Sequence, residues 1–166
     1  GFFVLIIFFI VKPKVFFRYS KYIYWINVLL LILVLFFGTT VNGSKAWFRF
    51  SYFSFQPSEL MKFSLSLYLS KILAQSKSSN MKQEFKVLLK AIFITLIPSL
   101  FVFLEPDTGA IIIYFIIMMG MIFVYRINYK WYILFGVVLI LFFGIFFYLY
   151  YFNQELLIQL IGTSFF

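Results

Sequence analysis

The chain has 166 residues, of which 64% are hydrophobic and 25% are aromatic. A soluble domain of this length could not bury so much apolar surface, so the composition predicts several membrane-spanning helices. The formal net charge is +9, but the cations lie in short segments between apolar runs, which indicates a positive-inside membrane topology rather than a nucleic-acid-binding surface. The chain has no Cys and no His, which excludes thiol nucleophiles, imidazole bases, disulfides and Cys/His zinc sites within it.

A membrane-spanning helix needs about 20 apolar residues, and the apolar runs predict one partial and five whole spans. The partial span, residues 1–11, has neither a basic leader nor a cleavage site, so we interpret it as the inner end of a longer helix and the chain as a fragment. We expect an all-α polytopic membrane protein, with residues 1–166 forming one partial membrane domain. The whole spans are predicted over 22–38, 57–74, 87–104, 110–125 and 131–150.

The charged residues predict which ends of the spans lie inside the cell. Most of the 14 Lys and Arg residues lie in or beside three of the connecting segments. The opposite side holds only Lys45, Arg49 and Lys62. The positive-inside rule makes the richer side cytoplasmic, so the outer segments are 39–56, 105–109 and 151–166.

Four of the five acidic residues then lie at the outer ends of apolar segments. They are Glu59, Glu105, Asp107 and Glu155. Acidic side chains near lipid are costly, and those that occur there commonly serve a function. We therefore expect chemistry or binding on the outer face.

The span 57–74 is the least hydrophobic of the set. Glu59, Lys62, Ser66 and Ser70 recur with the spacing of one helix face. Such a polar stripe either faces the bundle interior or a wet cavity, or forms a close helix–helix contact. Glu59 follows Pro57 in the first turn, so a capping role for Glu59 also stays open.

The segment Glu105 to Gly109 predicts a tight turn between two spans. Pro106 can end one helix and begin the next, and Asp107 then lies beside unpaired N–H groups. One interpretation is a capped turn. The other is that Asp107 pairs with Lys62 or Arg49 at the same depth and joins the outer ends of two spans.

The outer stretch 42–55 mixes aromatic residues with cations. Lys45 and Arg49 flank Trp47, and Phe and Tyr residues follow. This pattern suits a phosphorylated lipid headgroup at a membrane surface. On composition alone, an aromatic belt that binds no ligand is the preferred interpretation.

Three segments resemble sequence elements of the SEDS family (shape, elongation, division and sporulation proteins), and they are closer to its RodA branch than to FtsW. They are Gly43-Ser44-Lys45-Ala46-Trp47, Phe55-Gln56-Pro57-Ser58-Glu59 with Lys62, and Glu105-Pro106-Asp107-Thr108-Gly109. The corresponding family elements are G-A-x-R-W, F-Q-P-S-E-x-x-K and Q-P-D-x-G. In two departures, Ala46 replaces the Arg of the first element and Glu105 replaces the Gln of the third. Lys45 or Arg49 is a candidate substitute for that Arg.

The resemblance implies a ten-helix bundle in the bacterial cytoplasmic membrane. It also implies a glycosyltransferase that polymerises lipid II, an undecaprenyl diphosphate-linked disaccharide peptide, into peptidoglycan for cell-wall elongation and cell shape. The expected partners are lipid II, membrane lipids and a class B penicillin-binding protein transpeptidase, with no nucleic acid. We assign no cofactor, and a divalent cation stays open.

The family's proposed catalytic Asp lies in a large outer loop after the seventh span, and this chain has no such motif. We therefore assign no catalytic residue and no metal ligand, and we expect the fragment alone to be inactive. The candidates for substrate binding or support are Lys45, Trp47, Arg49, Glu59, Lys62, Glu105 and Asp107.

Two other functions fit a membrane protein of this kind: a flippase for lipid-linked oligosaccharides, and a non-catalytic scaffold of the cell-wall machinery. A flippase is expected to carry polar residues through the middle of several spans. Here such residues are confined to the span 57–74, which favours the enzyme.

Overall fold

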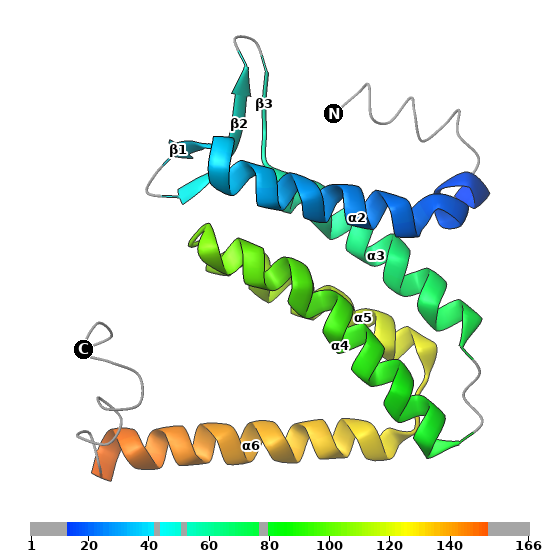
Figure 1. The fold of residues 1–166 in the computed structure, drawn as a ribbon. Helices are drawn as coiled ribbons and strands as arrows, with labels where there is room; N and C mark the ends of the chain where they lie inside the picture. The colour runs from blue at the N-terminus through cyan, green and yellow to red at the C-terminus, as the bar shows by residue number, and fades with distance from the viewer. Residues whose placement is uncertain (1–12, 42–43, 51–52, 77–79, 153–166) are drawn as a thin grey trace. The chain divides into compact units, whose positions relative to one another are not determined.

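The computed structural model describes residues 13–41, 44–50, 53–76 and 80–152 (Figure 1). The predicted partial span 1–11 lies outside these residues, as does the predicted outer segment from residue 153 onward. The elements are α2 (Pro13–Phe37), β1 (Thr39–Val41), β2 (Ser44–Phe50), β3 (Phe53–Phe55), α3 (Pro57–Gln75), α4 (Met81–Leu104), α5 (Thr108–Tyr125) and α6 (Tyr129–Phe152).

The helices follow the predicted spans closely at most of their ends. Helices α3, α5 and α6 begin and end within about two residues of the predicted positions, inside the usual uncertainty of helix ends. Helices α2 and α4 begin earlier than predicted, at Pro13 and Met81. Lys and Arg residues expected in loops instead occupy the first turns of these helices, where their long side chains can reach water.

Among the described residues, three helical segments are long and apolar enough to cross a membrane: Lys14–Phe37, Met81–Leu104 and Thr108–Tyr125. Helix α3 is less apolar because it carries Glu59, Lys62, Lys71 and several Ser residues. In α6 the apolar segment Tyr129–Leu141 is shorter. The helices thus differ in how readily each could lie in lipid.

Helix α3 has the most neighbours in the first compact unit of the chain, which ends at Arg126. It packs against α2, α4 and α5, and α4 also packs against α2 and α5. The fully buried apolar side chains of α3 are Met61, Leu65 and Leu69. Helix α6 belongs to a second compact unit that begins at Ile127.

Helix α4 continues through Pro98. Proline has no N–H group, so it leaves the carbonyl of Ile94, four residues earlier, without its helical donor. The hydroxyl of Tyr24 on α2 donates to that carbonyl at 2.7 Å, in a buried position. A side chain of a neighbouring helix therefore replaces the hydrogen bond that Pro98 removes.

The stretch between α2 and α3 forms a three-stranded antiparallel sheet in the order β1-β2-β3, which the sequence analysis did not predict. In the β2–β3 hairpin Phe48 is opposite Phe55 and Arg49 is opposite Ser54. The rings of Phe48 and Phe55 lie with centroids 5.4 Å apart. Such cross-strand aromatic pairs stabilise a two-stranded ribbon.

Candidate functional site: a polar junction between α3, α5 and β2

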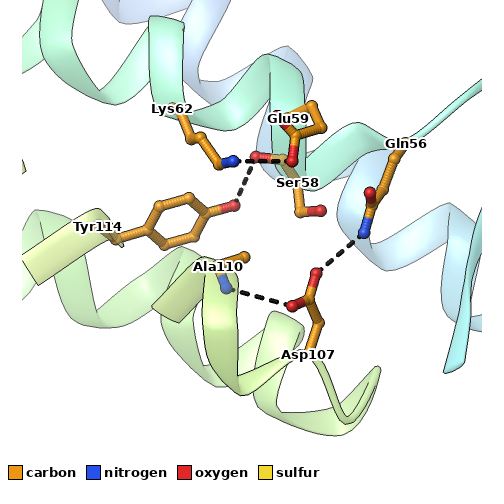
Figure 2. A network of polar contacts seen from close by, with 7 residues as sticks. All are labelled: Gln56, Ser58, Glu59, Lys62, Asp107, Ala110 and Tyr114. Atoms are coloured by element: carbon orange, nitrogen blue, oxygen red, sulfur yellow. Dashed lines mark hydrogen bonds and ion pairs between the residues drawn. The ribbon is translucent and has the colours of Figure 1, made fainter. Parts of the chain in front are cut away.

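Polar side chains gather where β2, the start of α3 and the α4–α5 turn meet. We call this group the polar junction, and Figure 2 shows much of it. Each residue makes a hydrogen bond to another element or lies buried between elements. The polar junction consists of Ser44, Gln56, Ser58, Glu105, Asp107 and Tyr114.

Asp107 joins the beginning of α5 to the beginning of α3. Its Oδ1 accepts a hydrogen bond from the backbone N–H of Ala110 at 3.1 Å, which caps the N-terminus of α5. Its Oδ2 accepts from the side-chain amide of Gln56 at 2.9 Å (Figure 2). The capped-turn interpretation is therefore confirmed, and the same carboxylate also ties the two helices together.

The predicted pairing of Asp107 with Lys62 or Arg49 is wrong. The ammonium of Lys62 instead lies 2.7 Å from Oε1 of Glu59, one turn earlier on the same helix (Figure 2). Arg49 is exposed on β2, opposite Ser54. A pair three residues apart on one helix forms whatever the packing of the other helices. A pair between two helices forms only when the packing brings their side chains together.

The polar stripe of α3 is satisfied largely by its own helix. The hydroxyl of Ser66 donates to the carbonyl of Lys62 at 2.8 Å, and that of Ser70 donates to Leu67 at 2.8 Å. The side chain of the cap residue Gln56 makes no cap hydrogen bond to α3. The negative charge of Glu59 still favours the first turn of the helix.

Tyr114 of α5 makes a second connection to α3. Its hydroxyl donates to the backbone carbonyl of Ser58 at 2.9 Å, and its side chain is fully buried (Figure 2). The sequence analysis missed Tyr114, Gln56, Ser58 and Ser44 as members of the site. The position of Gln56, directly before the helix-starting Pro57, was the available signal for its role.

Two buried polar groups of the polar junction have no hydrogen-bond partner among the described residues. They are both carboxyl oxygens of Glu105 and the hydroxyl of Ser58, and both side chains are fully buried. Burial and, as the smaller cause, the nearby carboxylate of Asp107 together raise the pKa of Glu105 to about 8. Glu105 is therefore mainly protonated at neutral pH.

Strand β2 places the candidate cations apart from Asp107. Lys45 donates from Nζ to the carbonyl of Phe36 at 3.0 Å, which satisfies a free carbonyl at the end of α2. Trp47 is half-buried and Arg49 is exposed. The predicted site residues thus form two groups, one on β2 and one around the beginnings of α3 and α5.

Ala46 is fully buried, at the position where the resembled element has Arg. Side chains alternate between the faces of a strand, so Lys45 and Arg49 lie on the opposite face from Ala46. A substitute cation at either position would therefore approach a ligand from the other face of β2. The substitution of that Arg by Lys45 or Arg49 stays a prediction.

The acidic residues do not form a metal site in the described part of the chain. No three Asp or Glu side chains there come close enough to hold one ion. The polar junction instead consists of hydrogen bonds among amide, hydroxyl and carboxyl groups. Such groups can position the helices and can keep a carboxyl group protonated.

The comparisons with known proteins agree with this architecture. The FtsW/RodA/SpoVE family, described as "Cell cycle protein", matches residues 1–161. The chain is a polytopic membrane protein that belongs to this family. The predicted SEDS membership is confirmed.

Curated relatives in this family carry the name "Probable peptidoglycan glycosyltransferase FtsW". The protein of Coxiella burnetii is 42% identical over 105 residues, which cover 62% of this chain and 28% of the relative. The protein of Haemophilus influenzae is 34% identical over 107 residues, which cover 64% of this chain and 27% of the relative. The matched region therefore spans less than a third of either relative.

Solved structures show the same fold. Thermus thermophilus rod shape determining protein RodA superimposes with a TM-score of 0.63 at 26% identity, over 84% of this chain and 44% of that chain. A structure titled "Structural coordination of polymerization and crosslinking by a peptidoglycan synthase complex" gives 0.71 at 26% identity, over 91% and 45%. The predicted all-α polytopic fold is confirmed, while FtsW and RodA names both occur among the similar proteins.

Proposed function

We propose that the protein is a peptidoglycan glycosyltransferase that polymerises lipid II, in a RodA-like role in cell-wall elongation and cell shape. The observation that carries the proposal is the polar junction, which fixes the beginnings of α3 and α5 to each other in a chain of the FtsW/RodA family. The RodA-like assignment rests on the three sequence elements quoted above.

Glycosyl transfer from a polyprenyl diphosphate needs cations for the leaving diphosphate, a base for the attacking hydroxyl and an apolar surface for the lipid. Arg49 is the best candidate for the diphosphate, because it is exposed and its guanidinium can bind phosphate in a bidentate manner. Lys62 is a weaker candidate, since Glu59 already neutralises much of its charge. We expect the base to be a carboxylate beyond Phe166.

Gln56, Asp107 and Tyr114 have a supporting role in this proposal. Their hydrogen bonds set the position of α3 against α5, and hence the position of Lys62 relative to the membrane surface. Glycosyl transfer is sensitive to small misplacements of binding groups, because the reacting atoms must be held in line. The polar junction supplies that rigidity.

The proposed setting is the bacterial cytoplasmic membrane, with the polar junction on its outer face and a class B penicillin-binding protein as partner. The distribution of Lys and Arg supports this orientation. One structural neighbour belongs to work on the structural coordination of polymerization and crosslinking by a peptidoglycan synthase complex, which supports a transpeptidase partner.

A flippase and a non-catalytic scaffold remain the alternative functions. The flippase is disfavoured because the hydroxyls of Ser66 and Ser70 bond to the backbone of α3 rather than facing a common path. Helix α4 also has mid-helix polar residues, Thr95 and Ser99, which the sequence analysis did not count, and their hydroxyls likewise bond to their own helix. These hydroxyls therefore do not form a row of free hydrogen-bonding groups along which a polar substrate could cross the membrane.

The experiment uses the purified full-length protein with lipid II, without any partner. We expect glycan polymer, and we expect Arg49→Ala to reduce polymerisation much more than Ser54→Ala, the matched control on the opposite strand. Transfer of lipid II across a vesicle bilayer without polymer would support the flippase instead. If neither polymer formation nor transfer is observed, the result supports the non-catalytic scaffold.

A further inference from the structure

Glu105 lies in the polar junction, in an environment that disfavours the ionised form of its carboxyl group. Its side chain is fully buried, and neither carboxyl oxygen meets a hydrogen-bond partner among the described residues. An ionised carboxylate in such a position would lose its hydration without compensation, whereas the neutral acid loses much less. The geometry therefore favours a proton on Glu105.

The backbone of Glu105 holds the α4–α5 turn in place. The hydroxyl of Ser44 on β2 donates to its carbonyl oxygen. The N–H groups of Glu105 and Asp107 donate to the carbonyl of Val102 at 3.1 and 3.3 Å. Because Asp107 follows only two residues later, a displacement of Glu105 would also displace the carboxylate that binds Gln56.

Asp107 is the charge that acts on Glu105, and burial together with this charge raises the pKa of Glu105 to about 8. On the elements that pack near the turn, Tyr114 of α5 is a neutral donor, α3 carries the Glu59–Lys62 pair, and β2 carries Lys45 and Arg49. Helix α4 has no charged residue between Lys90 and Glu105.

We propose that Glu105 is a positioning residue that acts in its protonated form. The neutral carboxyl keeps the α4–α5 turn packed against β2, and this packing holds Asp107 against Gln56. Loss of the proton places a second negative charge beside Asp107 in a buried site, so the turn moves away from β2. The polar junction is thus a pH-sensitive clamp between β2, α3 and α5.

The test measures the distance between β3 and the start of α5 in the full-length protein, in lipid nanodiscs. Spin labels on cysteines introduced at Ser54 and Thr108, both exposed, report this distance by pulsed electron paramagnetic resonance. We expect one narrow distance distribution at pH 6 and a broad one at pH 10, with a midpoint near pH 8. Glu105→Gln should keep the narrow distribution at both pH values.

The matched control is Glu84→Gln, the same chemical change at the opposite end of α4. It should leave the pH response of the distance as in the unchanged protein. A distance that does not respond to pH, or a response that persists in Glu105→Gln, would overturn the proposal.

A second measurement connects the clamp to activity, and it rests on the proposed function. The pH–rate profile of lipid II polymerisation should fall above pH 8 in the unchanged protein and extend to higher pH in Glu105→Gln. A profile that is identical in both proteins would remove the catalytic relevance of the clamp. The spin-label distance is measured without substrate, so it tests the clamp independently of activity. Absence of polymerisation would refute the proposed function and would leave the result for the clamp unchanged.

Discussion

The middle of α4 and the polar junction handle buried polar groups in different ways. In α4, Tyr24 donates to the carbonyl that Pro98 leaves unpaired, and the hydroxyls of Thr95 and Ser99 bond to their own helix. In the polar junction, Glu105 and Ser58 keep buried polar atoms without a partner among the described residues.

The difference follows from what each region has to do. A lipid-facing helix has no water to satisfy its backbone, so every free carbonyl must find a donor inside the protein. A junction at the helix ends can tolerate a group that destabilises the resting fold when that group controls position or charge. We propose that the unpaired groups mark the functional end of the bundle, and four predictions test this contrast.

The largest expected effect is the pH dependence of stability that Glu105 causes. Its pKa rises from the ordinary 4.5 to about 8 on folding, so the folded state keeps a proton that the unfolded state loses. Stability should be flat below pH 4.5, fall between pH 4.5 and 8, and level off above pH 8. The total loss is about 5 kcal/mol, from the free energy per pKa unit.

Glu105→Gln should remove this fall, so that the variant gains stability over the unchanged protein as the pH rises. Unfolding in detergent micelles at pH 4, 6 and 9 measures the change. Parallel curves for the two proteins would show that Glu105 does not hold its proton in the folded state.

The next effect concerns Asp107, whose carboxyl oxygens both accept hydrogen bonds within the described part of the chain, unlike those of Glu105. Asp107→Ala removes the cap of α5, which stabilises by about 1 kcal/mol, and the charge-assisted bond from Gln56, which adds about 2 kcal/mol. Thermal unfolding should show a combined loss of about 3 kcal/mol. Gln56→Ala should show only the second part, and an equal loss for both variants would contradict the double role of Asp107.

Tyr24→Phe should cost about 2 kcal/mol, because it leaves the carbonyl of Ile94 buried without a donor. Pro98→Ala restores an N–H four residues after Ile94, so the helix can supply the bond itself. In that background Tyr24→Phe should cost clearly less, which a double-mutant cycle measures. The same cost in both backgrounds would mean that Tyr24 does not replace the bond lost at Pro98.

The smallest effect is expected for the ion pair of Lys62 and Glu59. The exposed fractions of the two side chains are 24% and 57%, and exposed pairs contribute about 0–1 kcal/mol. Glu59→Gln should therefore change thermal stability little. A loss above about 2 kcal/mol would place this pair among the buried interactions of the polar junction.

The sequence predicted the helices better than their contacts. Apolar length and the Pro57 start located α3 almost to the residue, because span length is a local property. The early starts of α2 and α4 were missed, since Lys residues in a first helical turn look like loop residues. The sheet was missed because the aromatic excess of the whole chain concealed the alternation in β2 and β3.

The sequence predicted several residues of the candidate site, but it did not predict which of them contact one another. Asp107 and Glu105 were found from their place in a turn, but their states depend on Gln56, Ser44 and the burial that only packing decides. Tyr24 had a usable signal, since Pro98 in a span implies an unpaired carbonyl at Ile94 that needs a donor. Which tyrosine supplies the donor is set by the packing of α2 against α4.

The most direct test of the account asks whether the polar junction faces the outside of the cell. Single cysteines at Thr108, beside the polar junction, and at Asn80, at the opposite end of α4, are exposed to a membrane-impermeant maleimide in intact cells. We predict that the Thr108→Cys protein is labelled at once and that the Asn80→Cys protein is labelled only after permeabilisation. Labelling of Asn80→Cys alone in intact cells would place the polar junction in the cytoplasm and contradict the proposed meeting with lipid II.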